Sequence, residues 1–123
     1  LTHTVAAGDS ISPRLSDRAR ALIESPAATG WVSAASVWEI AIKHGLGRGD
    51  MPVSGQEALG YFQESGYRLL AVLPEHAAAV VDLPPHHQDP FDRLLVAQAL
   101  TEPLRLLTHD AMVARYSDTI IEI

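Results

Sequence analysis

Three carboxylates stand where an α/β fold usually places catalytic groups, close to the ends of short apolar runs. Glu39 follows the apolar run at 29–34, Asp92 opens a helical pattern at 90–101, and Asp110 follows the apolar run at 104–108. Carboxylate oxygens are preferred ligands of Mg²⁺ and Mn²⁺, and a cation held this way can activate water against a phosphodiester. If the fold brings the three side chains together, the sequence predicts a metal-dependent hydrolase.

Each acid also has a purely structural interpretation. Ser36 and Glu39 have the spacing of a capping box, with Ser36 as N-cap and Glu39 at N3. Asp92 is an acid in a first helical turn, where the helix dipole favours negative charge. Asp89 is a candidate N-cap of the same helix, and Asp110 can cap the turn after its strand. The spacing of the acids does not decide between these interpretations.

Other kinds of site are less favoured. His86 and His87 suggest a zinc hydrolase, but adjacent histidines in a loop rarely bind one ion together. The chain has no cysteine, which excludes a thiolate site and fits a reducing compartment. It contains no Gly-rich phosphate loop and no G-x-S-x-G elbow, which disfavours a nucleotide-binding protein and a serine hydrolase. Trp31 and Trp38 are expected to pack in or near the core.

Composition narrows the class further. The chain has 123 residues, of which 47% are hydrophobic and 20% charged, so we expect one folded domain. No apolar run approaches the length of about 18 residues that a membrane span needs. The net charge of −6 argues against a broad phosphate-binding surface. It remains compatible with an acidic metal site and a few basic contacts to a nucleic acid backbone.

Apolar runs and turn residues predict alternating strands and helices. We expect strands at 1–7, 29–34, 67–73, 104–108 and 119–123, helices at 13–24, 36–46, 55–65, 74–82 and 90–101, and a helical turn at 110–116. This pattern is typical of a three-layer α/β domain with a short, mostly parallel central sheet flanked by helices. Ligands bind such sheets at the carboxyl ends of their strands. The acids should meet there, with Thr2, Ser33 and Thr108 supplying neutral oxygens.

Two long motifs and one short motif resemble a known family. They read VSAASVWEIAIKHGLGR at 32–48, PPHHQDPFDRLLVAQAL at 84–100, and LLTHD at 106–110. In this order they resemble PIN-domain toxins of the VapC type, and the resemblance covers nearly the whole chain. It implies a cytoplasmic bacterial endoribonuclease that uses Mg²⁺ or Mn²⁺ to cleave structured RNA, such as tRNA or rRNA. It also implies a small antitoxin partner of the VapB type that blocks the site, and a homodimer.

The resemblance assigns roles to individual residues. It implies that Glu39 of the W-E-I motif, Asp92 of the D-P-F-D-R motif and Asp110 after the fourth strand are the catalytic metal ligands. Asp89 becomes an auxiliary acid. We further predict that the RNA backbone contacts come from basic side chains near these motifs, and the candidates are Lys43, Arg48 and Arg93.

One family position departs from the pattern. The family's first strand ends in L-D-T-H, and its aspartate is a principal metal ligand, whereas this chain reads Leu1-Thr2-His3. Leu1 therefore stands where the aspartate is expected. Either a ligand has been lost, or the sequence is incomplete or altered near its start, and the first strand is expected to be shortened. The alternative function is a catalytically impaired PIN-like module that still binds its antitoxin, with or without RNA.

Overall fold

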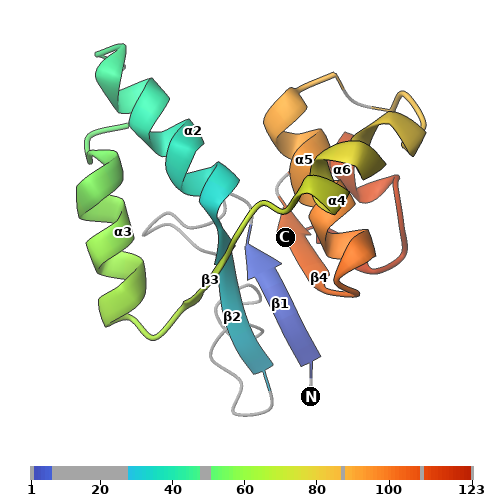
Figure 1. Ribbon diagram of the computed structural model, residues 1–123, viewed down its shortest axis with the longest axis horizontal. Helices are drawn as coiled ribbons and strands as arrows, with labels where there is room; N and C mark the ends of the chain where they lie inside the picture. The colour runs from blue at the N-terminus through green and yellow to red at the C-terminus, as the bar shows by residue number, and fades with distance from the viewer. Residues whose placement is uncertain (1, 7–27, 48–50, 87, 109, 123) are drawn as a thin grey trace.

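A parallel β-sheet runs through the centre of the molecule (Figure 1). The computed structural model describes residues 2–6, 28–47, 51–86, 88–108 and 110–122. Within these ranges the strands are β1 (Thr2–Ala6), β2 (Ala28–Ser33), β3 (Arg68–Leu70), β4 (Arg105–Thr108) and β5 (Ile120–Glu122). Their order is β3-β2-β1-β4-β5, and all four neighbouring pairs are parallel. The predicted α/β class with a short parallel sheet is confirmed.

Helices follow β2, β3 and β4, as the sequence predicted. They are α2 (Ala34–Gly45), α3 (Gly55–Glu64), α4 (Pro74–Ala79), a 3₁₀ turn η2 (Val80–Asp82), α5 (Pro90–Thr101) and α6 (Ala111–Ala114). The helix predicted at 90–101 has the same bounds as α5, and the helix predicted at 55–65 corresponds to α3, which ends one residue earlier. The segment predicted as one helix at 74–82 is α4 followed by η2. The helix predicted at 13–24 lies outside the described residues.

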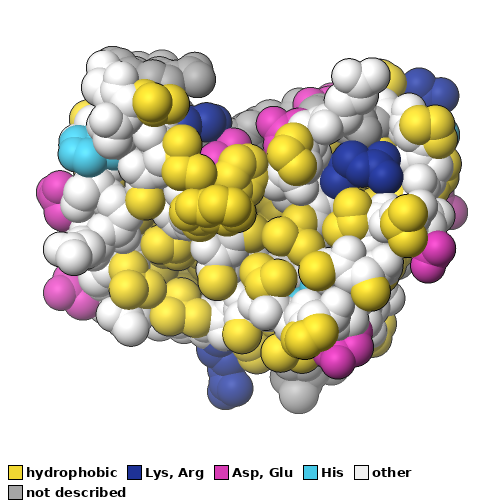
Figure 2. Space-filling view, turned by 45° about the horizontal axis from the view of Figure 1, so that its top comes forward, with side chains coloured by type: hydrophobic (Ala, Val, Ile, Leu, Met, Phe, Trp, Pro, Cys, Tyr) yellow, Lys and Arg dark blue, Asp and Glu magenta, His cyan; other side chains and the backbone are white. Residues whose placement is uncertain are grey.

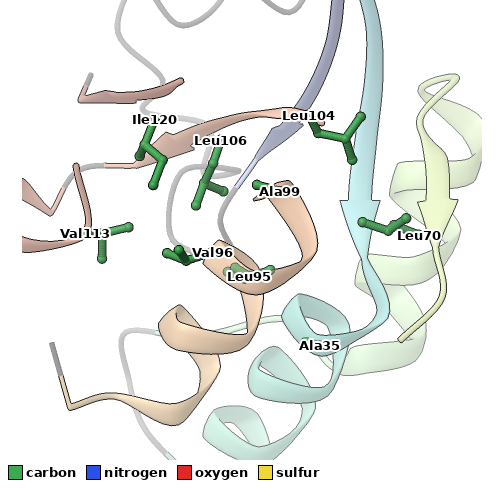
Figure 3. Packing of buried hydrophobic residues seen from close by; sticks show 9 residues of the cluster. All are labelled: Ala35, Leu70, Leu95, Val96, Ala99, Leu104, Leu106, Val113 and Ile120. Carbon is green, nitrogen blue, oxygen red and sulfur yellow. The ribbon is translucent and has the colours of Figure 1, made fainter. Parts of the chain in front are cut away.

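Two clusters of buried hydrophobic residues hold the layers together. The larger joins residues of α2, β3, α5, β4, α6 and β5 (Figure 3), and its buried members are Ala35, Leu70, Leu95, Val96, Ala99, Leu104, Leu106, Val113 and Ile120. The smaller consists of Val32, Ile40, Ala58 and Phe62, from β2, α2 and α3. Trp31 packs against the larger cluster and the next residue, Val32, belongs to the smaller. Successive strand residues point to opposite faces, so helices cover both faces of the sheet.

The start of α2 corrects one prediction. The helix begins at Ala34 and its N-cap is Ser33, whose Oγ accepts a hydrogen bond from the Ala35 N–H at 3.0 Å. Ser36 is therefore at the third helical position, and Glu39 lies well inside the helix, so the predicted capping box of these two residues is wrong. A serine that closes a strand can cap a helix that follows without a loop, which makes the cap three residues earlier possible.

The register of β1 corrects another prediction. Thr2 pairs with Ala28, the first residue of β2, whereas Ala6 pairs with Val32 near the carboxyl end. Thr2 therefore lies at the amino end of the sheet, on the edge opposite Ser33 and Thr108. The prediction that Thr2 supports the site at the carboxyl edge is wrong, because parallel strands begin at one common edge. None of the described helices is long and apolar enough to cross a membrane.

Candidate active site

An aromatic contact joins the helices that carry two of the predicted ligands. The rings of Trp38 on α2 and Phe91 on α5 meet edge to face, with centroids 5.1 Å apart and an interplanar angle of 68°. Glu39 follows Trp38 in the chain, and Asp92 follows Phe91. Consecutive Cα atoms are about 3.8 Å apart, so this contact places both acids in one neighbourhood. Two sequence segments that are far apart thereby reach one region of the surface.

Glu39 is largely shielded from solvent and is paired with a cation. Its side chain is 15% exposed, and its Oε2 lies 3.1 Å from Nζ of Lys43, one helical turn further along α2. The Lys43 side chain is 30% exposed, so it still has access to solvent. An ammonium group beside a carboxylate neutralises part of the charge that a metal ion would otherwise balance. Lys43 was predicted as an RNA contact, and in this structure it also has this local role.

The entrance of α5 is fixed by Asp89. Its Oδ1 accepts hydrogen bonds from the backbone N–H groups of Phe91 and Asp92, at 2.8 and 3.2 Å. The prediction that Asp89 is an N-cap is confirmed, and Pro90 occupies the first helical position, which it favours. Asp92 lies in the first turn and is half-buried. The cap therefore determines where the Asp92 backbone sits relative to α2.

Asp110 lies at the carboxyl end of β4. Its N–H donates to Thr108 Oγ1 at 3.0 Å, and its Oδ1 accepts from the Met112 N–H at 2.8 Å. The prediction that Asp110 caps the following helical turn is confirmed. Thr108 is buried and its hydroxyl holds the Asp110 backbone. Both β4 and α6 pack against α5, the helix that carries Asp92.

A buried chain of polar side chains, which the sequence did not reveal, supports Ser33. The Ser33 hydroxyl donates to Gln98 Oε1 on α5 at 2.6 Å, and both residues are fully buried. Gln98 Nε2 donates to the carbonyl of Ala71 at 3.3 Å and lies 3.4 Å from Nδ1 of His76. The one signal was Gln98 itself, a polar residue inside the apolar run LLVAQAL.

His76 continues this chain to the surface. Its Nδ1 accepts the Leu73 N–H at 3.0 Å, which leaves the ring proton on Nε2, 2.7 Å from Glu102 Oε2. These hydrogen bonds therefore fix Ser33 and the start of α2 relative to α5. The neighbouring Ser36 hydroxyl is fully buried and has no hydrogen-bond partner in the described structure.

The basic candidates differ in their surroundings. The Arg93 guanidinium donates to the carbonyls of Val80 and Pro84 at 3.0 and 3.3 Å and to the Tyr116 hydroxyl at 3.2 Å. These bonds hold the segment before α5 and give Arg93 a structural role, while its predicted RNA contact remains a prediction. Arg48 lies outside the described residues.

The structure also places both tryptophans and the first residue of the histidine pair. Trp31 is half-buried, with the Arg68 guanidinium 5.8 Å from its ring centroid, as expected for a residue near the core. Trp38 is 60% exposed, so the prediction that it packs in or near the core is wrong. His86 meets the ring of Tyr116 edge to face with centroids 5.0 Å apart, and His87 lies outside the described residues.

The donor chemistry suits a hard divalent cation, because Glu39, Asp92 and Asp110 offer only oxygen. The arrangement of these three side chains fits a bound cation less well than their chemistry does. Among the described residues, no group of three or more His, Cys, Asp or Glu side chains lies close enough together to hold a metal ion. The described residues therefore supply the ligand types but not a complete three-acid cluster. That a metal binds here, and through which residues, stays a prediction.

Comparison with known proteins identifies the family. The sequence matches the family described as PIN domain over residues 12–118. The chain belongs to the PIN domain family. PIN domains are generally nucleases and typically depend on divalent metal ions. A comparison with curated protein sequences found no match.

Three solved structures share the fold over almost the whole chain. VapBC2 from Rickettsia felis, bound to a promoter DNA fragment, has a TM-score of 0.72 at 13% identity, covering 99% of this chain and 98% of that one. A toxin–antitoxin complex from Klebsiella pneumoniae has a TM-score of 0.66 at 15% identity, with coverage of 98% and 99%. FitAcB from Neisseria gonorrhoeae has a TM-score of 0.65 at 17% identity, with coverage of 98% and 96%. At these identities the likeness confirms the PIN fold.

Proposed function

We propose that this PIN domain is a VapC-type endoribonuclease toxin that hydrolyses phosphodiester bonds in structured RNA and is inhibited by a small antitoxin. The observation that carries the proposal is the Trp38–Phe91 contact, with ring centroids 5.1 Å apart, which brings Glu39 and Asp92 into one neighbourhood. Motifs resembling the VapC type and the toxin–antitoxin complexes among the structural neighbours support it. We expect a VapB-like antitoxin and a second copy of the chain as partners.

The residues divide the work in this proposal. Glu39 and Asp92 would each offer a carboxylate to Mg²⁺ or Mn²⁺, with Asp110 as the candidate third ligand, and the ion when bound would balance the charge developing on the phosphate. Asp89 positions Asp92 through the first turn of α5, and Thr108 positions Asp110 through its backbone. Ser33 anchors the start of α2 against α5 through Gln98. Lys43 would be freed for the RNA backbone when a cation replaces it beside Glu39.

Cleavage of total RNA tests this proposal. The purified protein should cleave in Mg²⁺ or Mn²⁺ and not in EDTA, and Glu39→Gln and Asp92→Asn should each lower the rate by at least about 100-fold, as expected for groups at the reacting centre. Glu64→Gln and Asp118→Asn are matched controls, since they make the same chemical changes at exposed positions. The controls should cleave like the parent. If the two control variants also lost activity, the lower cleavage rates of Glu39→Gln and Asp92→Asn would reflect damaged protein samples and not the loss of these carboxylates.

A second candidate is a catalytically impaired module that retains antitoxin binding. Leu1 stands at the family's aspartate position, and the described acids do not form a three-acid cluster. In this case neither metal supports cleavage by the parent. The parent, Glu39→Gln and Asp92→Asn proteins would then bind a small protein encoded directly upstream equally well in co-purification. If the parent protein cleaves RNA in a metal-dependent way, that result is sufficient to rule this candidate out.

A further inference from the structure

The side chain of Trp38 is unusually accessible for its type. It is 60% exposed, whereas tryptophan is highly buried on average in folded proteins. Its ring is not loose, because the Phe91 ring meets it at 68° and 5.1 Å. An edge-to-face contact covers at most one face of one of the two rings. The surface therefore presents an aromatic ring that Phe91 holds in place and that is more than half exposed.

The position of this plane is specific. Trp38 immediately precedes Glu39, and its partner Phe91 immediately precedes Asp92. Both acids belong to the candidate active site, so the two rings in contact are each carried by a residue next to a candidate ligand in the chain. Hydrophobic side chains gather on the face shown in Figure 2, with basic and acidic side chains next to them. A nucleotide suits this setting, because its base can stack on the exposed ring and its phosphate can meet Lys43, one helical turn from Glu39.

We propose that Trp38 is a stacking platform for an unpaired RNA base next to the scissile phosphate. Proteins that bind single-stranded RNA stack its bases on aromatic side chains, whereas bases inside a duplex are covered by their neighbours. The inference rests on the proposed nuclease function and deepens it, since it assigns the contact with a base beside the cleaved bond to Trp38. Stacking tolerates any base, so Trp38 selects for an unpaired nucleotide and not for a sequence.

A protein partner is the competing occupant of this surface. Ile42, one helical turn along α2, is 37% exposed, and Leu46 after the helix is 71% exposed. An apolar helical stripe of this kind also suits a partner helix. The two occupants differ in what they require. A partner helix would contact Ile42 as well as Trp38, whereas a single stacked base requires the Trp38 ring and its support by Phe91.

Tryptophan fluorescence and RNA binding test the platform directly. The chain has two tryptophans, so Trp31→Phe leaves Trp38 as the only reporter. Binding is measured in Asp92→Asn protein, so that cleavage does not interfere, with a ten-nucleotide single-stranded RNA of mixed sequence. The RNA should quench Trp38 emission, and an abasic oligomer of equal length should not. Trp38→Ala should weaken binding about 5- to 150-fold, the range measured for loss of one base–aromatic stack.

Matched variants separate the occupants. Trp38→Phe keeps a stacking face and should retain most of the affinity, and Ile42→Ala should bind RNA like the parent. The inference is overturned if Trp38→Ala binds RNA as tightly as the parent, if the abasic oligomer quenches equally, or if RNA does not bind. It is also overturned if Ile42→Ala weakens RNA binding as much as Trp38→Ala. If RNA quenches Trp38 emission but the parent shows no metal-dependent cleavage, base stacking on Trp38 is supported and the proposed nuclease function is refuted.

Discussion

The contact between α2 and α3 makes a sharp prediction about stability. A Cβ atom added at Gly55 would lie 2.7 Å from Cβ and 3.4 Å from Cα of Ala41. Neither atom can rotate away, because both are fixed to the α2 backbone, so Gly55→Ala must move one helix relative to the other. Overpacking of this kind typically costs about 1–3 kcal/mol. The same helix offers a control at Gly60, where an added Cβ meets nothing within 4 Å.

The two variants isolate the steric cost. Gly60 lies inside α3, where exchange of glycine for alanine by itself stabilises a helix by about 0.5–1 kcal/mol, whereas Gly55 is the first residue of the helix. Gly60→Ala should therefore raise the free energy of unfolding, and Gly55→Ala should fall about 1–3 kcal/mol below it. Urea denaturation measures this, since a slope of about 1–3 kcal/mol per M converts the difference into a midpoint separation of about 1 M. The penalty should shrink in an Ala41→Gly background, which removes the contacted methyl group. Equal stabilisation by Gly55→Ala and Gly60→Ala would refute the close approach of the helices.

Three further changes test other parts of the structure. Asp89→Ala should lower the unfolding free energy by about 1 kcal/mol through loss of the α5 cap, and Asp89→Ser should recover most of it in the same denaturation assay. Gln98→Leu should cost about 1–3 kcal/mol, because the buried Ser33 hydroxyl loses its acceptor, and Ser33→Ala in the same chain should reduce this cost. Hydrogen bonds from the backbone and side chain of Ser54 lower the pKa of Glu57, so its carboxylate stabilises the fold above the pKa of an unfolded glutamate, and this contribution is lost as the pH falls through the folded pKa. An NMR titration should find the Glu57 pKa below that of an ordinary glutamate, and Ser54→Ala should raise it, whereas an unchanged value would contradict the capping box.

Local signals explain where the sequence predicted structure well. The start of α5 was predictable because Asp89 and Pro90 are the preferred residues for an N-cap and the first helical position. The strand predicted at 67–73 is shorter in the structure, since β3 ends at Leu70 at the edge of the sheet. The next residues, through Val72, are exposed, and their hydrophobicity suggested a longer strand than the sheet accommodates.

Tertiary contacts explain what the sequence could not predict. The bond between Ser33 and Gln98 joins residues 65 positions apart, and no local pattern links them. Trp38 has the residue type of a core position, but its exposure depends on which face of α2 the sheet and α3 cover. The candidate acids could be named from their motifs. Their distances from one another depend on the packing of α2 against α5, which is set by contacts such as the ring pair of Trp38 and Phe91.

The most direct test of the central claim is a double-mutant cycle on Glu39 and Asp92. Metal-dependent RNA cleavage is measured for the parent, Glu39→Gln, Asp92→Asn and the combined variant. If both side chains serve one catalytic centre, the combined variant should be no slower than the slower single variant by more than a few-fold, because groups that act as a unit are not additive. If the combined loss equals the product of the two single losses, the two acids act independently, and the account of one centre built by α2 and α5 is wrong.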